Sequence, residues 1–338
     1  MTAVERLSLS DAETLIREAL IGVGTPLPAA QSVASALVAA QAEGQVGHGF
    51  SRLNDYAAQV RSGKIRADAV VNITPLGAAA LHVDAGCGFA FPALEAALNA
   101  GLPRAQDAGI CIMAVGNSHH CGALSVQVEK IAQAGLIGLM MANSPKAIAP
   151  WGAAEALYGT NPIAFATPQA NGAPLVIDLS LSRVARGKVM NAHKSGASIP
   201  EGWALDTQGN PTTDPSAALA GTMVPIGEAK GTALALMVEI LTTAFTGSAF
   251  SKDAGSFFSA DGDAPRVGQT LIAIRPNAAT GYLDRVQDLL ETLGDMPGTR
   301  LPGARRRAAI ATAHAEGIDV PLIYLDQARA LARGEPPT

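Results

Sequence analysis

Short β-branched runs alternate with helix-like stretches through the middle of this chain, and this alternation most constrains its fold. The strand-like runs cover residues 70–73, 81–83, 110–115, 136–141, 163–166, 175–178 and 270–274. Between them lie helix-like stretches at 91–105, 123–134, 184–193 and 232–245. Strands mixed with helices in this way predict an α/β or α+β core.

The two ends of the chain favour helices. Ser10-Asp11-Ala12-Glu13 has the form of a capping box and opens a predicted first helix. A second helix is expected over 29–41, with Pro28 in its first turn. After the glycine-interrupted segment 44–49, apolar residues recur at helical spacing, and 304–332 reads as helix again.

Composition limits the classes of function. The chain has 338 residues, 48% hydrophobic and 16% charged, which is enough for two or three lobes with well-buried cores. A formal net charge of -5 argues against a broad basic face for nucleic acid. A few local Arg and Lys residues can still hold a small anionic ligand.

Cysteine usage and the apolar segments indicate a cytoplasmic protein. Cys87, Cys111 and Cys121 are odd in number and lack CxxC spacing, as is typical of free thiols in a reducing compartment. Residues 1–13 carry no secretory pattern, and the longest apolar stretches are far shorter than a membrane span. We therefore expect neither a membrane nor a nucleic-acid partner.

The first segment with chemical potential is Gly47-His48-Gly49-Phe50-Ser51-Arg52. If a helix begins near His48, its imidazole and the Arg52 guanidinium share one face. The imidazole can exchange a proton near neutral pH, and the guanidinium can bind a carboxylate through two hydrogen bonds. The pair suits a carboxylate substrate with an adjacent C=O or C=N. The alternative is a turn-capping histidine beside a surface arginine.

The second segment, 117–123, lies between a predicted strand and a predicted helix and contains His119, His120 and Cys121. Backbone N–H groups at a helix start suit an anion such as a phosphate. Zinc is disfavoured because no partner pair stands at ligand spacing, so no metal is expected. An ordinary strand-to-helix turn is the alternative.

Four further segments resemble ligand-binding edges, and each also has an ordinary explanation as a turn or a solvated basic helix face. They are 158–162, 176–188, 227–231 and 300–307, the last with three consecutive arginines. A dinucleotide fingerprint is missing: Gly86-Cys87-Gly88 is followed by Phe91 where the third glycine should stand. Walker-type and G-x-S-x-G motifs are absent as well.

These segments, in this order, resemble the malate/L-lactate dehydrogenase type 2 family of NAD(P)H oxidoreductases. The similarity runs from Gln41 to about Gly317 and is carried by His48-Gly49 with Arg52, Ala149-Pro150-Trp151-Gly152, Gly159-Thr160-Asn161-Pro162, Ala185-Arg186-Gly187-Lys188, 199–204 and 211–215. It implies a homodimer with a non-Rossmann α/β (α+β) fold of the L-sulfolactate/malate dehydrogenase type. That fold combines a largely antiparallel cofactor-binding sheet with a helical lobe.

The expected domains are a helical catalytic lobe (1–65 with 300–338), a small α/β segment (66–115) and an NAD(P)-binding domain (116–299). By resemblance, His48 is the proton donor and Arg52 binds the substrate carboxylate. Thr160, Arg186 and Gly187 match substrate-contact positions, and Lys188 is a candidate for tuning His48. Many family members carry Ser before this histidine, where this chain has Gly47.

The positions matching cofactor contacts form four groups: His120, Cys121, Gly122, Ala123 and Leu124; Asp178, Leu179 and Ser180; Ala229 and Lys230; and Arg300, Leu301, Pro302, Gly303, Ala304, Arg305 and Arg306. The arginine cluster favours NADPH, with NADH as the alternative. His119-His120 and the short loops resemble the branch that reduces Δ1-piperideine-2-carboxylate and Δ1-pyrroline-2-carboxylate to L-pipecolate and L-proline. A malate- or lactate-type dehydrogenase and a non-catalytic binding protein remain as alternatives.

Overall fold

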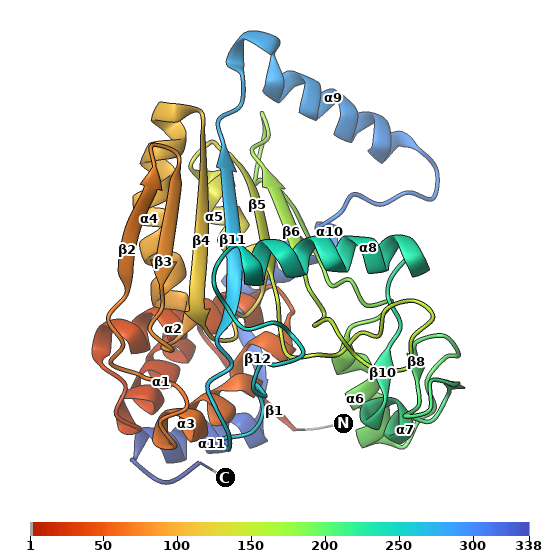
Figure 1. Cartoon of the computed structure of the whole chain (residues 1–338). Coiled ribbons are helices and arrows are strands. Elements are labelled where there is room, and N and C mark those ends of the chain that lie inside the picture. The colour runs from red at the N-terminus through yellow and green to blue at the C-terminus, as the bar shows by residue number, and fades with distance from the viewer. Residues whose placement is uncertain (1–2, 338) are drawn as a thin grey trace.

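The computed structural model describes residues 3–337 and centres on a seven-stranded sheet (Figure 1). Its strands, in spatial order, are β2 (Asn72–Gly77), β3 (Ala80–Asp84), β4 (Ile110–Ser118), β11 (Val267–Ile274), β5 (Ile137–Ala142), β6 (Ile163–Thr167) and β7 (Leu175–Leu179). Neighbouring strands in this sheet run antiparallel, except for the parallel pair β3–β4. The largely antiparallel α/β fold expected from the sequence is confirmed, and the first strand lies at 72–77 instead of 70–73.

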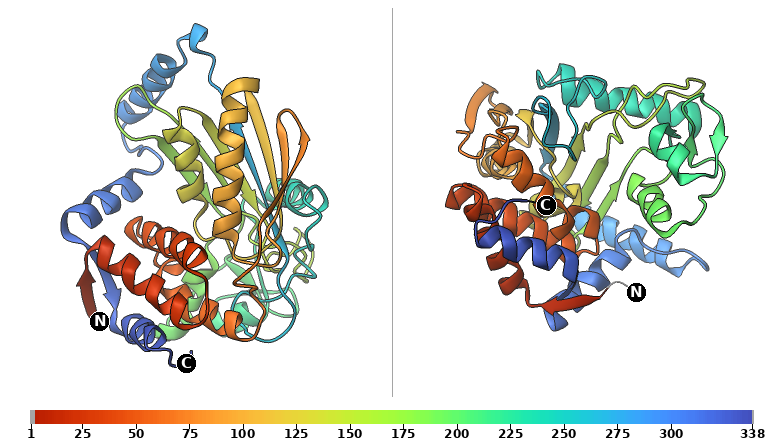
Figure 2. Two further views of the ribbon diagram at one scale, coloured as in Figure 1. Left: turned by 90° about the vertical axis from the view of Figure 1, so that its left-hand side faces the viewer. Right: turned by 90° about the horizontal axis from the view of Figure 1, so that it is seen from below.

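Helices cover both faces of this sheet. On one face, α4 (Ala90–Ala108) packs on β3 and β4, and α5 (Leu124–Gln133) packs on β5, β6 and β7 (Figure 2, left). On the other face, α8 (Glu228–Glu239) crosses the strands and widens into the π-helical turn η3 (Ile240–Ala244). Leu81, Met113 and Leu271 are fully buried between these layers. The expected 66–115 segment thus shares one sheet with the 116–299 range.

A helical lobe lies at one end of the sheet and combines both ends of the described chain. It contains α1 (Leu9–Gly22), α2 (Leu27–Ala42), α3 (Leu53–Arg61), α10 (Ala304–Glu316) and α11 (Leu322–Ala332). Strands β1 (Val4–Leu7) and β12 (Ile318–Pro321) pair antiparallel beside them. Ile16, Leu37 and Leu325 are fully buried in its core, and burying such a side chain contributes about 1.5–3 kcal/mol.

The remaining elements lie around the sheet. A three-stranded sheet of β10 (Thr222–Met223), β8 (Ala204–Leu205) and β9 (Pro211–Thr212) accompanies α6 (Arg186–Ser195) and α7 (Pro215–Ala220). Helix α9 (Tyr282–Asp295) projects from the end of the sheet and buries only Leu290 among its residues (Figure 1). Within 3–337, no helix is both long and apolar enough to cross a bilayer.

Two sequence-based helix boundaries are wrong. The first helix is capped by Ser8 and not Ser10, because the Ser8 hydroxyl accepts a hydrogen bond from the Asp11 backbone N–H at 3.1 Å. The continuous helix expected over 304–332 is broken by β12. The break begins at Gly317, whose φ of 88° leaves the helical region and whose missing Cβ leaves room for the Leu7 carbonyl.

A buried polar junction joins the helical lobe to the sheet. The Arg306 guanidinium on α10 lies 2.5 Å from Glu43, at the end of α2, and 2.5 Å from Glu129 on α5. Glu43 also accepts a hydrogen bond from the Ser125 hydroxyl at 2.5 Å. The side chains of Arg306 and Glu43 are only 10% and 3% exposed, so each carboxylate depends on this cation for compensation.

Replacing Arg306 with Met is expected to lower the free energy of unfolding by about 3 kcal/mol, because it leaves a buried carboxylate pair without its counter-charge. Urea unfolding followed by circular dichroism measures the change. Arg305→Met is the matched control, since Arg305 is exposed on the same helix and should change stability by less than about 0.5 kcal/mol. Equal stability of the two variants would contradict the role of the junction.

Candidate active site

His48 and Arg52 lie on two separate 3₁₀ turns and not on one α-helical face. The first turn covers Val46–His48 and the second covers Phe50–Arg52, with α3 beginning only at Leu53. The predicted i,i+4 helical pairing is therefore wrong, although the two side chains still act on each other electrostatically.

Gln41 explains the break between the two turns. Its side-chain carbonyl accepts a hydrogen bond from the Phe50 backbone N–H at 3.3 Å. A Cβ atom on Gly49 would lie 2.1 Å from that same oxygen. Gly49 is thus required for internal packing against α2, and not for the close approach of a ligand.

Arg52 is oriented by three neighbours. Its Nε donates a hydrogen bond to the Gly47 carbonyl at 2.8 Å, and its guanidinium lies 3.6 Å from Asp55. The Phe258 ring stacks against it, with 4.6 Å between Cζ and the ring centroid. The side chain keeps 15% of its surface accessible, so an anion can reach a guanidinium whose direction is already fixed.

His48 is the accessible end of a cluster of imidazoles. Its Nδ1 lies 3.2 Å from Nε2 of His120, and Nδ1 of His120 lies 2.6 Å from the Tyr56 hydroxyl. His119 points elsewhere, with its Nε2 2.8 Å from the Gln59 side-chain carbonyl. The turn 117–123 therefore brings two histidines against the helical lobe, each with a different partner.

A loop encloses this cluster from the other side. The Gln59 amide donates to the Phe257 carbonyl, and Lys64 donates to the carbonyls of Ser259 and Asp261, each at 2.9 Å. These bonds hold the Phe257 ring 5.2 Å from the His120 ring centroid. The cluster is thereby walled with aromatic surface.

Burial keeps the three histidines neutral. It lowers the pKa of His48 to about 4, with a further contribution from the positive charge of Arg52. Burial likewise lowers the pKa of His119 to about 3, followed by Lys64 and Arg52, and it lowers the pKa of His120 well below its usual value. An anion bound at Arg52 would offset its positive charge. The pKa of His48 would then rise, and the neutral imidazole would accept a proton more readily.

The start of α5 is occupied by a carboxylate of the protein itself. Asp178, at the end of β7, accepts a hydrogen bond from the Ser125 backbone N–H at 2.8 Å. The residues expected to contact a cofactor at this turn, His120, Cys121, Gly122, Ala123 and Leu124, are all buried. Asp178 therefore satisfies one of the N–H groups at this helix start, and the cofactor contacts expected of the turn stay a prediction.

Three other expected cofactor segments lie along β7 and the residues after it. Gly303 abuts β7, since a Cβ there would lie 2.7 Å from the Val176 carbonyl oxygen. The start of α8 lies beside the residues that follow β7, because the Ile226 backbone N–H donates a hydrogen bond to the Leu181 carbonyl at 2.8 Å. Helices α8 and α10 begin after Gly227 and Gly303 without a side-chain cap. Uncapped helix starts beside Ala229-Lys230 and 300–305 suit the phosphates of a dinucleotide.

The arginine cluster divides between two roles. Arg300 and Arg305 are exposed, whereas Arg306 is engaged by Glu43 and Glu129. Its guanidinium neutralises two internal carboxylates, and the cofactor contact expected of Arg306 stays a prediction. The neighbouring Leu301, Pro302 and Ala304 lie at the start of α10, next to the exposed arginines.

The expected substrate positions beyond Arg52 form a second group. Thr160 donates its backbone N–H to the Ser144 hydroxyl at 3.0 Å and lies beside Leu181. Arg186, at the start of α6 next to Gly187, donates to the Leu219 carbonyl at 3.2 Å. Burial lowers the pKa of Arg186, and no carboxylate pairs with it within residues 3–337. A bound anion would supply the missing counter-charge.

Lys188 does not tune His48 within one chain. Its ammonium lies 6.0 Å from the centroid of the Trp203 ring, and its side chain is exposed. In the described chain, the charge that acts on His48 comes from Arg52 alone. Tyr56 follows Arg52 by four residues, a spacing that is compatible with a role in the site. Its apolar neighbours instead indicate a core residue. Phe258 had no sequence signal.

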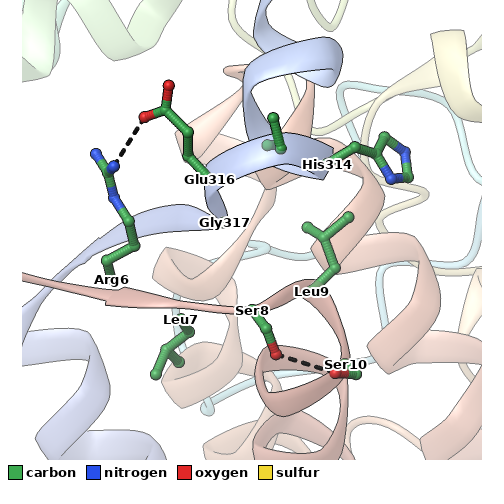
Figure 3. A pocket seen from close by; sticks show the side chains of 10 residues that line it. Arg6, Leu7, Ser8, Leu9, Ser10, His314, Glu316 and Gly317 are labelled. Carbon is green, nitrogen blue, oxygen red and sulfur yellow. Dashed lines mark hydrogen bonds and ion pairs between the residues drawn. The ribbon is translucent and has the colours of Figure 1, made fainter.

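A cavity elsewhere in the molecule does not include these residues. A cavity of about 610 Å³ lies between β1, the start of α1 and the end of α10 (Figure 3). Arg6 points into it and binds Glu316 at 2.9 Å and Asp319 at 2.7 Å, so its charge is already compensated. In residues 3–337, no three His, Cys, Asp or Glu side chains gather in a way that would hold a metal ion.

Comparison with known proteins gives the family. Residues 7–327 match the model of the malate/L-lactate dehydrogenase family. The chain belongs to this family. It is 49% identical to a (2R)-3-sulfolactate dehydrogenase (NADP(+)) of Chromohalobacter salexigens, over 96% of this chain and 98% of that protein. It is 37% identical to a Δ1-pyrroline-2-carboxylate/Δ1-piperideine-2-carboxylate reductase of Pseudomonas putida, over 94% of each protein.

Solved structures agree with this assignment. Δ1-piperideine-2-carboxylate reductase from Pseudomonas syringae pv. tomato superposes with a TM-score of 0.92 at 37% identity, covering 97% of this chain and 99% of that one. Sulfolactate dehydrogenase from Methanocaldococcus jannaschii gives a TM-score of 0.89 at 26% identity, covering 97% and 96%. The fold is shared by both groups, so the fold alone does not select the substrate.

The buried histidines predict acid sensitivity. Their folded-state pKa values lie below the ordinary 6.5, so the unfolded chain binds more protons as the pH falls. The free energy of unfolding should be level above about pH 6.5 and should decrease from there towards pH 4. His48 alone accounts for a loss on the order of 3 kcal/mol.

Urea unfolding at several pH values between 7.5 and 4.5 measures this slope. His48→Gln should give a shallower slope than the unmodified protein. The raised pKa of Asp178, caused by burial, acts in the opposite direction in both proteins and cancels in the comparison. Identical slopes would show that His48 is not held neutral by the fold.

Proposed function

We propose that this protein is an NADP(H)-dependent oxidoreductase that interconverts a 2-hydroxy acid and the corresponding 2-oxo acid, with a substrate of the 3-sulfolactate class. The geometry that carries the proposal is a half-buried guanidinium, Arg52, fixed beside an accessible neutral imidazole, His48. The substrate class is supported by the 49% identity to a sulfolactate dehydrogenase, against 37% to an imine reductase. These values favour a hydroxy acid over the cyclic imines that His119-His120 suggested.

In this proposal Arg52 binds the carboxylate next to the reacting carbon. The substrate anion offsets the charge that lowers the pKa of His48, so the imidazole becomes a better base when substrate binds. A nicotinamide cofactor held by the segments 178–180, 229–230 and 300–305 would supply hydride exchange at that carbon. His48 takes the hydroxyl proton during oxidation and gives it back to the oxygen during reduction.

Arg186 is proposed to bind the other anionic group of the substrate. Thr160 and Gly187 belong to the same set of expected substrate positions. Its guanidinium is half-buried and lacks an internal carboxylate partner in the described chain. A sulfonate or second carboxylate would provide that partner, which a lactate molecule lacks. The segments 178–180, 229–230 and 300–305 are proposed to hold the cofactor. Exposed Lys230, Arg300 and Arg305 favour the additional phosphate of NADPH.

The homodimer implied by the family resemblance is also a proposal. Leu236, Met237 and Ile240 on α8 and η3 are 46%, 44% and 50% exposed, and they form an apolar strip along one segment. A second copy of the chain would cover this strip.

A parallel assay of purified protein tests the substrate class. NADP⁺ reduction is followed at 340 nm with 3-sulfolactate, malate and lactate, and NADPH oxidation is followed with Δ1-piperideine-2-carboxylate and Δ1-pyrroline-2-carboxylate. We expect the highest kcat/KM with 3-sulfolactate. Turnover of the cyclic imines alone would replace this proposal with imine reduction, the activity named for the relative that is 37% identical. Cofactor binding without turnover of any of these compounds would indicate a non-catalytic protein.

Single substitutions separate the two anion sites. Arg52→Ala should raise KM at least about 10-fold for every carboxylate substrate, because each loses a charged hydrogen-bond partner. Arg186→Met should raise KM for 3-sulfolactate by a similar factor and leave KM for lactate within about 2-fold. Arg183→Met is the control, since Arg183 already lies 3.8 Å from Glu228. A uniform effect of Arg186→Met on all substrates would remove its selective role.

His48→Ala should lower kcat by about 10²–10⁴-fold, as expected when general acid–base assistance is lost. Fluorescence titration with NADPH should give a nearly unchanged Kd. An unchanged kcat would exclude His48 from the chemical step.

A further inference from the structure

Three side chains form an unbroken hydrogen-bonded row behind the reacting position. His48, His120 and Tyr56 are joined by contacts of 3.2 Å and 2.6 Å, through both nitrogens of His120. The two imidazole rings are stacked, with centroids 5.2 Å apart and planes inclined by 10°. The row leaves Nε2 of His48 as the nitrogen not used within it.

The inner part of this row is sealed from water. Tyr56 is 1% exposed and His120 is 9% exposed. The rings of Phe89 and Phe257 pack against them, with centroids 5.6 Å from Tyr56 and 5.2 Å from His120. The charged and titratable groups that act on the row are Arg52, Asp55, His119 and Cys121. Because His120 is largely buried, both of its nitrogens need partners, and His48 and Tyr56 supply them.

Such a row has two consistent arrangements of its protons. In the first, Nδ1–H of His48 donates to His120 Nε2, and Nδ1–H of His120 donates to the Tyr56 oxygen. In the second, Tyr56 donates to His120, which donates to Nδ1 of His48. The first arrangement leaves a lone pair on Nε2 of His48, whereas the second places a proton there. Which nitrogen of His120 carries the proton therefore decides whether Nε2 of His48 has a free lone pair and can act as a base.

We propose that His120 and Tyr56 are positioning residues that set which nitrogen of His48 carries its proton and that stabilise the imidazolium formed when Nε2 accepts the hydroxyl proton. When Nε2 accepts the hydroxyl proton, Nδ1–H keeps its acceptor, so the charge forms without breaking a hydrogen bond. In the reverse direction Nε2–H returns its proton and the row is unchanged. The row supplies what Gly47 cannot, because glycine has no hydroxyl next to His48. This inference rests on the proposed function of His48.

Nitrogen NMR on protein labelled with ¹⁵N-histidine tests the proton arrangement without any substrate. At neutral pH we expect Nδ1 of His48 to be protonated and Nε2 to be unprotonated. The opposite pattern would overturn the proposal even if the enzyme is active. The expected pattern in a protein that turns over none of the assayed compounds would leave the row intact and reject the proposed function instead.

Tyr56→Phe tests the contribution of the far end of the row. It removes one hydroxyl and keeps the ring, so the imidazolium at His48 loses the support relayed through His120. We expect kcat to fall about 10-fold, with KM for the carboxylate substrate within about 2-fold because Arg52 is untouched. The acidic limb of the kcat/KM profile should move to lower pH by at least about half a unit. His120→Phe should lower kcat further, and the double variant should be no worse than His120→Phe alone.

Phe89→Leu is the matched control. It removes an aromatic contact with Tyr56 but leaves the hydrogen-bonded row, so it should lower the thermal midpoint without moving the pH profile. If Tyr56→Phe also lowers stability or kcat but leaves the pH profile in place, its role is structural and the proposal is wrong. Full activity and an unchanged profile in folded Tyr56→Phe would likewise overturn it.

Discussion

The arrangement of the candidate site depends on the hydrogen bonds made by one residue at the start of α5. The Ser125 backbone N–H binds Asp178 of the sheet, and its hydroxyl binds Glu43 at the end of α2. Glu43 in turn holds Arg306 on α10. His48 follows Glu43 by five residues, and His120 precedes Ser125 by five. Ser125 joins these two segments. Because only a few residues separate each histidine from this junction, the two imidazoles are held close enough to make contact.

The pKa values of the histidines are low because burial and the positive charge of Arg52 are not offset by a nearby carboxylate. Each of the three lowered pKa values has burial as its main cause, and Arg52 adds to all three. Asp55 lies 3.6 Å from Arg52 and acts on Tyr56, but it is not among the groups that shift the pKa of the three histidines. The free site is therefore short of negative charge. An anionic substrate supplies it, so binding and proton transfer are coupled through the same pair of residues.

Local sequence signals predicted most elements of the fold, and the family resemblance carried by the order of the motifs predicted a largely antiparallel sheet with a helical lobe. The strand runs, the helices over 91–105 and 123–134, and the His48–Arg52 segment all follow from spacing and composition. Contacts between distant segments could not be predicted in this way. The need for glycine at position 49 comes from Gln41, which fills the space beside it and lies on another helix. The hydrogen bond between Asp178 and Ser125 joins residues 53 positions apart, so no local pattern in the sequence indicates it.

The same limit applies to the arginines. Arg305 and Arg306 are adjacent and chemically identical, yet one faces solvent and the other lies between two carboxylates. A helix places neighbouring residues about 100° apart, so the sequence alone cannot tell which one faces inwards until the surrounding lobe is known. His120 illustrates the opposite case, since its residue type was recognised but its partner, Tyr56, looked like an ordinary core aromatic.

The pairing of β1 with β12 has a consequence for how the protein is made. Strand Val4–Leu7 pairs with Ile318–Pro321, and α1 packs against α11. The lobe that carries His48 therefore contains contacts between residues more than 300 positions apart. During synthesis the sheet can assemble as it emerges, whereas this lobe lacks its last strand and helix until the ribosome has translated nearly the whole sequence. Chains released early would contain a formed sheet beside an incomplete reaction centre. The lobe that carries His48 is thus completed only after β12 and α11 have been made, whereas every strand of the large sheet is present by Ile274.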